Sequence, residues 1–329
     1  MVSILLFVFR AIVVLSLGLF VVGLFKPEWI SFRGKQWDRF SITVTALVLF
    51  VLGFTGIGEM RNYESNPRND FDAHTISETT YKVDATTPRC APGSKPGRPG
   101  ATDDEEAPHG GIEYNVRAPA NYDGTIAHPL LMVYAPATRS ASASEEFTYL
   151  TRQATEAGFI VAYSDHESLA PETIIQQSEI PGLIGQKWCV DKDRIFLTGH
   201  SDGGSISMGI AFINGTRDIP AAIAPSAVGI TGNDLLDRSC PDPIPVMVMH
   251  SANDSHFPGY GKQAVQWWAA CNACDRKNVR TLENGCVAYG DCANNVNTWY
   301  CEGTGQHPEW PGLNWVVIDF FKAAAGRKS

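Results

Sequence analysis

The sequence is poor in basic residues and has no stretch in which they cluster among aromatic side chains. Its 26 Lys and Arg residues are outnumbered by 35 Asp and Glu residues, so the formal net charge is −9 at pH 7. Proteins that bind the phosphate backbone of nucleic acids carry a basic patch or stripe. We therefore expect no nucleic-acid partner. The sequence also contains no internal repeat.

The first sixty residues contain two long apolar stretches. The first, residues 3–25, is interrupted only by Arg10 and two serines, and the second covers residues 41–58. Each is about long enough to cross a bilayer as a helix. The first stretch lacks the basic leader and the small-residue cleavage site, before Lys26, of a signal peptide. We therefore predict a membrane anchor of two transmembrane helices over residues 1–59, with a signal peptide or signal anchor as the alternative.

The connector between these two stretches is basic, since it contains Lys26, Arg33, Lys35 and Arg39. Positively charged connectors are retained on the cytoplasmic side of a membrane. The C-terminal domain is therefore expected on the extracytoplasmic side, in a periplasm or outside the cell.

Cysteine is absent before residue 90. The eight cysteines are Cys90, Cys189, Cys240, Cys271, Cys274, Cys286, Cys292 and Cys301. An even number beyond the anchor is typical of disulfides in an oxidising compartment. Zinc is the alternative, because Cys271 and Cys274 have the spacing of a metal knuckle, but no second pair of that spacing completes a site. We expect several disulfides, although the sequence does not determine which cysteines pair. We expect neither a metal nor a cofactor.

Composition divides the remainder of the chain into a tether and a catalytic domain. Residues 60–111 are polar and rich in Pro and Gly, which predicts a tether. Residues 112–329 alternate between strand and helix patterns, which predicts a doubly wound, mostly parallel sheet. The expected strands are 112–118, 130–134, 159–163, 194–198, 221–224, 245–250 and 296–300, and the expected helices are 144–157, 205–214 and 315–325.

A nucleophile elbow is the most informative motif. The stretch Arg194-Ile-Phe-Leu-Thr-Gly-His-Ser-Asp-Gly-Gly-Ser205 places a serine between glycines, after an apolar strand and before a helix-compatible run. In an α/β-hydrolase the nucleophile occupies such a strained turn, where neighbouring glycines avoid collisions with the strand and helix. We therefore predict that Ser201 is a nucleophile in an α/β-hydrolase fold.

A nucleophilic serine needs an orienting acid and a base, which follow it in this order in the fold. The predicted acid is Asp254, after the strand 245–250, with Asn253 and Asp291 as weaker candidates. The predicted base is His307, in the loop after the last strand. His256 is too close to Asp254 in sequence, and His250 lies where the strand enters the core. We interpret His200 as packing beside the nucleophile.

Several stretches together carry a resemblance to a family. They are Tyr114 to Tyr122, His128 to Tyr134, Trp188 to Gly204, His250 to Asp254, Trp267 to Cys274 and His307 to Gly312. In these stretches the chain resembles the polyhydroxybutyrate depolymerase and feruloyl esterase family of secreted α/β-hydrolases. The resemblance implies Ser201, Asp254 and His307 as nucleophile, acid and base. It also implies a carboxylic ester as substrate, of the polyhydroxyalkanoate, feruloyl or acetyl type.

The chain departs from that family in two loops. Where the family has His-Gly-Cys or His-Gly-Gly, this sequence has Ala135-Pro136-Ala137-Thr138. Because proline has no N–H, the first oxyanion donor is expected at Ala137 or Thr138, with the N–H of Asp202 as the second. The loop of His307 has one extra residue before Trp310. We expect the ring of Trp310 to contact the substrate. Trp267 and Trp268 could offer further aromatic surface to the substrate or belong to the core.

These observations predict a membrane-anchored serine esterase that uses a Ser-Asp-His triad and an acyl-enzyme. Ala135-Pro136 favours an alternative of another class, a tethered hydrolase-fold protein without turnover that serves as a binding or scaffold component. A serine peptidase on the same fold is a third reading.

Overall fold

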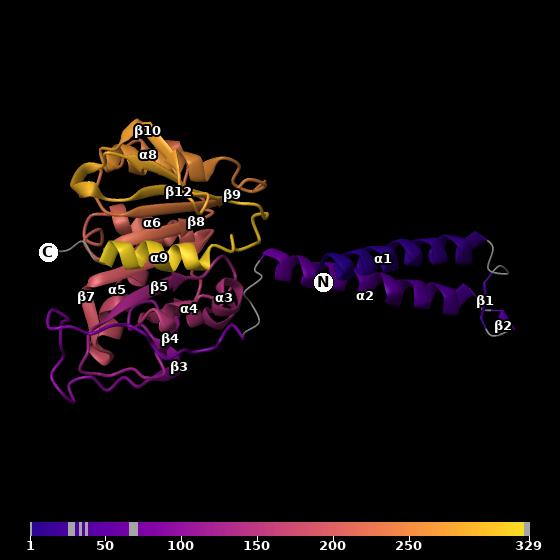
Figure 1. The fold of residues 1–329 in the computed structure, drawn as a ribbon, viewed down its shortest axis with the longest axis horizontal. Coiled ribbons are helices and arrows are strands. Elements are labelled where there is room, and N and C mark those ends of the chain that lie inside the picture. Colours follow the sequence, from indigo (N-terminus) through magenta and orange to yellow (C-terminus); the bar gives the residue numbers. More distant parts are fainter. Residues whose placement is uncertain (1, 26–29, 33–34, 37–38, 66–71, 326–329) are drawn as a thin grey trace. The chain divides into compact units, whose positions relative to one another are not determined.

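The computed structural model describes residues 2–25, 30–32, 35–36, 39–65 and 72–325. The chain divides into two compact units, Met1–Phe71 and Asp72–Ser329 (Figure 1).

The first unit is a pair of helices, α1 (Val2–Phe25) and α2 (Arg39–Ser65). Two-residue strands, β1 (Ser31–Phe32) and β2 (Lys35–Gln36), pair antiparallel between them. The helices approach closely at glycines, since a Cβ at Gly53 would lie 2.8 Å from a methyl group of Val13. Many large apolar side chains elsewhere on both helices are exposed.

The helices differ in how well they fit a membrane. Within the described residues, Phe7–Phe25 is the one helical stretch long and apolar enough to cross a bilayer, and Arg39–Thr55 is a shorter apolar stretch. The structure therefore supports one membrane-length apolar helix, and the second of the two predicted membrane helices is not confirmed. Lys26 and Arg33 of the basic connector lie outside the described residues.

The second unit is built on one ten-stranded sheet. Its strands, in sheet order, are β10 (Asp275–Thr281), β11 (Val287–Gly290), β12 (Thr298–Gly303), β9 (Val246–Ser251), β8 (Ala222–Ser226), β7 (Val190–His200), β5 (His128–Tyr134), β6 (Ile160–Ser164), β4 (Glu113–Ala118) and β3 (Gly100–Glu106). The strands from β12 to β6 are parallel to one another, and the two strands at each edge are antiparallel. The predicted mostly parallel sheet is confirmed.

Helices cover both faces of this sheet (Figure 1). One face carries α5 (Pro171–Lys187), α6 (Asp202–Phe212) and α8 (Tyr260–Cys271), and the other carries α3 (Ala141–Thr148), α4 (Thr151–Glu156) and α9 (Asn314–Ala325). In β5, Leu130 and Met132 face the first group, while Leu131 and Val133 face the second. A strand buried on both faces is apolar throughout, which explains why β5 could be recognised in the sequence.

Residues 72–111 belong to the second unit and do not form the predicted tether. The acidic strand β3 pairs antiparallel with β4, and the N–H of Gly97 donates to the C=O of Lys187 at 2.8 Å. A disulfide joins Cys90 to Cys189. Backbone hydrogen bonds and a covalent link therefore hold a segment whose Pro and Gly content had indicated an irregular tether. Residues 66–71 of the predicted tether lie outside the described residues.

A second difference concerns the helix predicted over residues 144–157. It is divided into α3 and α4, because Tyr149 adopts a left-handed conformation with φ of 53° that ends α3.

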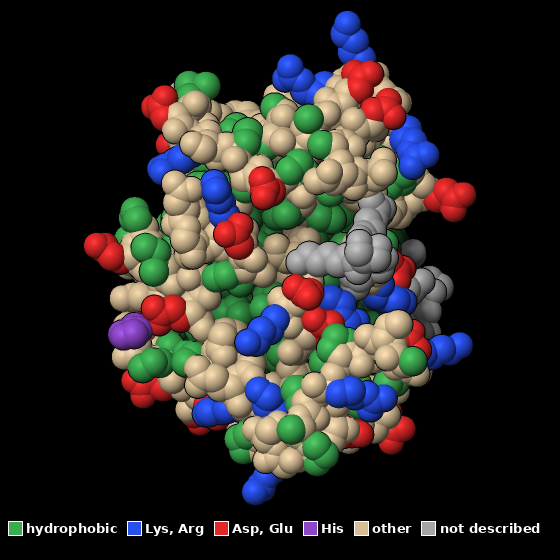
Figure 2. All heavy atoms as spheres, turned by 90° about the vertical axis from the view of Figure 1, so that its left-hand side faces the viewer, with side chains coloured by type: hydrophobic (Ala, Val, Ile, Leu, Met, Phe, Trp, Pro, Cys, Tyr) green, Lys and Arg blue, Asp and Glu red, His purple; other side chains and the backbone are tan. Residues whose placement is uncertain are grey.

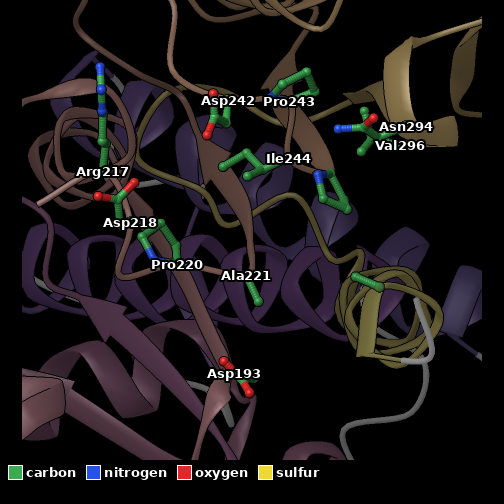
Figure 3. Close-up of a pocket in the computed structure, with 12 residues that line it drawn as sticks. Asp193, Arg217, Asp218, Pro220, Ala221, Asp242, Pro243, Ile244, Asn294 and Val296 are labelled. Carbon is green, nitrogen blue, oxygen red and sulfur yellow. The ribbon is translucent and has the colours of Figure 1, made fainter. Parts of the chain in front are cut away.

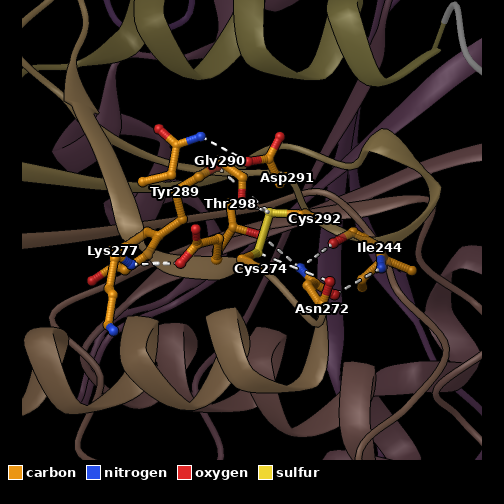
Figure 4. Close-up of a disulfide and its surroundings, with 11 residues drawn as sticks. Ile244, Asn272, Cys274, Lys277, Tyr289, Gly290, Asp291, Cys292 and Thr298 are labelled. Carbon is orange, nitrogen blue, oxygen red and sulfur yellow. Dashed lines mark hydrogen bonds between the residues drawn. A yellow bond between two sulfur atoms is a disulfide. The ribbon is translucent and has the colours of Figure 1, made fainter.

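All eight cysteines form disulfides, which confirms the disulfide prediction. The pairs are Cys90–Cys189, Cys240–Cys271, Cys274–Cys292 and Cys286–Cys301. Two buried polar side chains, Asn272 and Thr298, lie beside the third pair (Figure 4). There the side chain of Asn272 donates to the C=O of Ile244 at 2.9 Å and to the hydroxyl of Thr298 at 2.8 Å. This side chain links the end of α8 to the starts of β9 and β12.

Candidate active site

The predicted elbow joins β7 to α6. Ser201 has φ of 57° and ψ of −117°, a conformation that a non-glycine residue adopts only under strain. The glycines around it are required by close packing. A Cβ at Gly199 would lie 2.5 Å from the backbone of Gly203, and a Cβ at Gly203 would overlap the carbonyl oxygen of Tyr134 at the end of β5. The sequence thus folds into a turn that presents the hydroxyl of Ser201 at the carboxyl edge of the sheet.

The structure brings Ser201, His307 and Asp254 together. The Oγ atom of Ser201 lies 3.0 Å from Nε2 of His307, and Nδ1 of His307 lies 2.8 Å from Oδ2 of Asp254. Ser201 follows β7, Asp254 follows β9 and His307 follows β12, so three parallel strands deliver the three side chains to one edge. These distances meet the geometric requirement for a nucleophile, a base and an acid that orients the base.

The carboxylate of Asp254 is fixed by its own loop. Its Oδ1 accepts hydrogen bonds from the backbone N–H groups of His256 and Phe257, both at 2.9 Å. Burial raises the pKa of Asp254, but these contacts and the ring of His307 outweigh it and hold the pKa below its ordinary value. The side chain is fully buried. Asp254 is therefore ionised and oriented at neutral pH.

His200 packs beside the nucleophile, as predicted, and makes two polar contacts. Its Nε2 lies 2.6 Å from the carbonyl oxygen of His307, and its Nδ1 lies 3.0 Å from Oγ of Ser226. Burial lowers the pKa of His200 to about 4. The ring is therefore neutral, with Nε2–H as the donor to the carbonyl group of His307.

The weaker candidates are placed away from the acid position. Asn253 donates to the C=O of Thr304 at 2.8 Å, and Asp291 accepts from Asn278 at 2.8 Å. His256 lies against the ring of His307, with 4.8 Å between centroids. His250 is buried in β9, and its Nε2 lies 3.6 Å from Oδ2 of Asp254.

A tight turn follows β5 where the first oxyanion donor was predicted. The N–H of Arg139 donates to the C=O of Pro136 at 3.2 Å, and Thr138 has φ of 66°. Ala137 and Thr138 are exposed. Among the described residues, their N–H groups have no hydrogen-bond partner. Asp202 begins α6, so its N–H belongs to the first helical turn and lacks an intrahelical acceptor.

Trp310 is partly buried near the site, but its polar atom is already used. Its Nε1–H donates to Oδ1 of Asn314 at 2.6 Å, and its ring lies 6.2 Å from the ring of His200. Trp268 is fully buried, and Trp267 packs edge to face on Phe212. These last two tryptophans form core, which was one of the two readings that the sequence left open.

Two contacts near the site were not expected from the sequence. His166 follows β6, and its Nε2 lies 3.0 Å from Oδ2 of Asp202. Phe257 packs edge to face on the ring of His307, with 4.8 Å between centroids. The position of His166 directly after a strand was the available signal, because the carboxyl ends of parallel strands meet at one edge.

A cavity of about 410 Å³ lies elsewhere, at the amino ends of the central strands (Figure 3). Its lining includes Ala221, Pro245 and Val296, which directly precede or lie just before β8, β9 and β12. Charged groups of both signs also line the cavity: Asp193, Arg217, Asp218 and Asp242. The face of the molecule drawn in Figure 2 likewise mixes acidic and basic side chains. In open α/β sheets, ligands bind at the carboxyl ends of the strands. The cavity is therefore on the wrong edge for chemistry at Ser201.

Metal ligands do not gather at any point of the described chain, where no group of three or more His, Cys, Asp or Glu side chains has the geometry to hold an ion.

Comparison with curated proteins finds a relative among the esterases. Feruloyl esterase B from Piromyces equi is 28% identical over 242 residues, which cover 63% of this chain and 44% of that protein. The predicted resemblance to the feruloyl esterases is confirmed. The chain spans less than half the length of that relative. No protein-family model matches the sequence.

Solved structures show the same fold. An acetyl xylan esterase from Aspergillus awamori aligns with a TM-score of 0.51 and 14% identity, over 67% of this chain and 97% of its own. A truncated carbohydrate esterase from gut microbiota aligns with a TM-score of 0.50 and 12% identity, over 74% of this chain and all of its own. The predicted α/β-hydrolase fold is thus confirmed for the second unit, while at these identities the likeness concerns the fold alone.

Proposed function

We propose that this chain is a serine esterase that hydrolyses carboxylic esters through Ser201, His307 and Asp254. The observation that carries the proposal is the continuous hydrogen-bonded series from Ser201 Oγ to His307 and on to Asp254, at 3.0 and 2.8 Å. The strained backbone of Ser201 at a strand-to-helix turn supports the same role.

In the proposed mechanism, Nε2 of His307 takes the proton of Ser201 as Oγ attacks the ester carbonyl carbon. Asp254 holds the ring in the tautomer with Nδ1–H and stabilises the imidazolium that forms. The tetrahedral intermediate collapses, and the imidazolium gives its proton to the departing alcohol. Water, deprotonated by the same ring, then attacks the acyl-enzyme and releases the acid and free Ser201.

Backbone amides would bind the negative charge that develops on the ester oxygen. The proposed donors are the N–H groups of Ala137, in the turn after β5, and Asp202, at the start of α6. A helix N-terminus adds a favourable dipole at the second position. The unpaired amides of the turn and of the first helical turn support this assignment.

The proposed substrate class rests on resemblance to known esterases. A relative named as a feruloyl esterase and a fold neighbour named as an acetyl xylan esterase favour feruloyl or acetyl esters, and polyhydroxyalkanoate esters belong to the same proposal. We assign Trp310 to the substrate side of the site, because its ring packs edge to face on the ring of His200, with 6.2 Å between centroids.

The proposed location is the extracytoplasmic side of a membrane. The apolar stretch Phe7–Phe25, the shorter one at Arg39–Thr55 and the exposed apolar side chains of α1 and α2 support an anchor of two helices. Four disulfides support an oxidising compartment for the second unit.

Hydrolysis of p-nitrophenyl acetate by the full chain in detergent, compared with Ser201→Ala, tests the proposal. We expect the parent to hydrolyse the ester and the kcat of the variant to be lower by about 10³-fold or more. Equal rates in the two proteins contradict it. A panel of feruloyl, acetyl and hydroxyalkanoate esters then selects the substrate class.

A second candidate function is favoured by one observation. Pro136 offers no N–H in the loop where the resembled family has His-Gly-Cys or His-Gly-Gly, so a tethered binding or scaffold protein without turnover is the alternative. It predicts a chain that binds an ester ligand and does not hydrolyse it.

A further inference from the structure

His166, in the loop after β6, contacts both halves of the proposed oxyanion hole. Its backbone N–H donates to the C=O of Arg139 at 3.0 Å, and its ring Nε2 lies 3.0 Å from Oδ2 of Asp202. Arg139 ends the turn that carries Ala137, and Asp202 begins α6. The ring of His166 is 17% exposed and the side chain of Asp202 is 27% exposed, so the contact is partly shielded from water.

We infer that His166 is a positioning residue that fixes the turn after β5 and the start of α6 relative to each other. The inference rests on the proposed esterase function, since it concerns the two amides that would bind the oxyanion. One residue reaches one half of the hole through its backbone and the other half through its side chain.

The exposure and the backbone conformation of the outer residues of the turn show what such support would offset. Ala137 and Thr138 are exposed, and the left-handed conformation of Thr138 is unfavourable for a β-branched residue. Asp165, next to His166, strengthens the same attachment, since its Oδ1 accepts from the N–H of Ala141 at 2.6 Å. The dipeptide Asp165-His166 therefore fastens the chain directly after the turn at two points.

The other half of the hole is positioned from below. Gly203 lets α6 begin against the end of β5, because a Cβ there would overlap the carbonyl oxygen of Tyr134. The contact of Gly203 with Tyr134 determines how closely α6 approaches the end of β5. The ring of His166 contacts the outer side of the first turn of α6. Donors that are fixed before the reaction stabilise developing charge more than donors that must reorganise. The bridge thus acts on the transition state more than on the bound ester.

Three variants in the full chain test the bridge. His166→Phe removes the ring donor and leaves the backbone contact to Arg139, His166→Gln restores an N–H donor, and Asp202→Ala removes the acceptor while keeping the backbone amide. His109→Phe is the matched control, because His109 also contacts a carboxylate, that of Glu179 at 2.8 Å, in an exposed position on another part of the domain. The readouts are kcat, KM, melting temperature and affinity for a trifluoromethyl ketone that imitates the tetrahedral intermediate.

We expect kcat of His166→Phe to fall about tenfold, KM to stay within about twofold, and affinity for the ketone to fall by about the same factor as kcat. His166→Gln should recover most of the loss, and His109→Phe should match the parent. The double variant of His166→Phe with Asp202→Ala should be no slower than the slower single variant, since both changes remove the same contact.

Unchanged kcat and ketone affinity in His166→Phe would overturn the bridge, as would a loss confined to KM or strictly additive effects in the double variant. The parent and Ser201→Ala are measured in the same series. Absence of Ser201-dependent turnover in the parent contradicts the esterase proposal itself, whereas a working parent with an equally active His166→Phe contradicts only the bridge.

Discussion

The imidazole of His307 and the carboxylate of Asp254 lie 2.8 Å apart, although 53 positions separate them in the sequence. The neighbouring strands β12 and β9 bring them together, since each residue lies in the loop at the carboxyl end of its strand. Two backbone amides fix the second oxygen of Asp254, so the carboxylate has one direction in which to accept from the ring.

Replacement of Asp254 by Asn should lower kcat about 10³ to 10⁴-fold, because the amide favours the wrong tautomer of His307 and does not stabilise the imidazolium. Ester hydrolysis by Asp254→Asn measures this. Asp291→Asn is the matched control, since Asp291 was a weaker candidate for the acid and contacts Asn278 instead. Equal losses in the two variants would count against the assignment of Asp254.

The contact from His200 to the carbonyl group of His307 should also affect activity. His200→Phe fills the same space without the donor, and we expect kcat to fall about tenfold because the loop of His307 loses its attachment at 2.6 Å. His200→Gln should recover part of this loss. If Phe and Gln variants are equally active, the hydrogen bond has no role in positioning the base.

His200 and His74 should change the pH dependence of stability in opposite directions. The pKa of His200 is lowered to about 4 from 6.5, so between these values only the unfolded chain takes up its proton, and stability falls as pH falls. For His74, burial lowers the pKa, but Glu145 and Glu146 raise it to a net value above 6.5, so its stabilising effect is present below 6.5 and is lost as pH rises through the raised pKa.

The melting temperatures of His200→Gln, His74→Gln and the parent, recorded between about pH 4.5 and about pH 9, measure these two contributions to stability. As the pH is lowered from about 8.5 to about 5, the melting temperature of His200→Gln should rise relative to that of the parent. The melting temperature of His74→Gln should fall relative to that of the parent over the same range. Parallel curves for all three proteins would contradict the assigned protonation states.

The disulfide between Cys90 and Cys189 should stabilise the second unit, because it closes a loop between residues 99 positions apart. Its removal in Cys90→Ala/Cys189→Ala should lower the free energy of unfolding by about 2–4 kcal/mol. Thermal unfolding without reductant measures the change. Addition of reductant should lower the melting temperature of the parent and bring it close to that of the variant or below it; no response of the parent would argue against structural disulfides.

The sequence contained enough to predict the elbow, the parallel strands and the order of Ser201, Asp254 and His307. Each depends on local pattern: an apolar run buried on both faces, glycines where a Cβ would collide, and loops that follow such runs. The strands β3 and β10 were missed because they are polar edge strands without an apolar face; every residue of β10 is exposed. Helix α5 was missed as well, and Pro181 lies inside it.

Contacts between distant loops could not be read from the sequence. The position of residues 72–111 on the domain depends on pairing of β3 with β4 and on a disulfide whose partners composition does not identify. The contact of His166 with Asp202 joins two loops that follow different strands. Such contacts depend on strand order, and the strand pattern left that order undetermined.

Reaction of the full chain with a fluorophosphonate probe measures whether Ser201 is an activated nucleophile. The modified peptide is identified by mass spectrometry, in the parent and in Ser201→Ala. We expect stoichiometric modification of Ser201 in the parent and none in the variant. A parent that does not react, or that reacts at another serine, contradicts it.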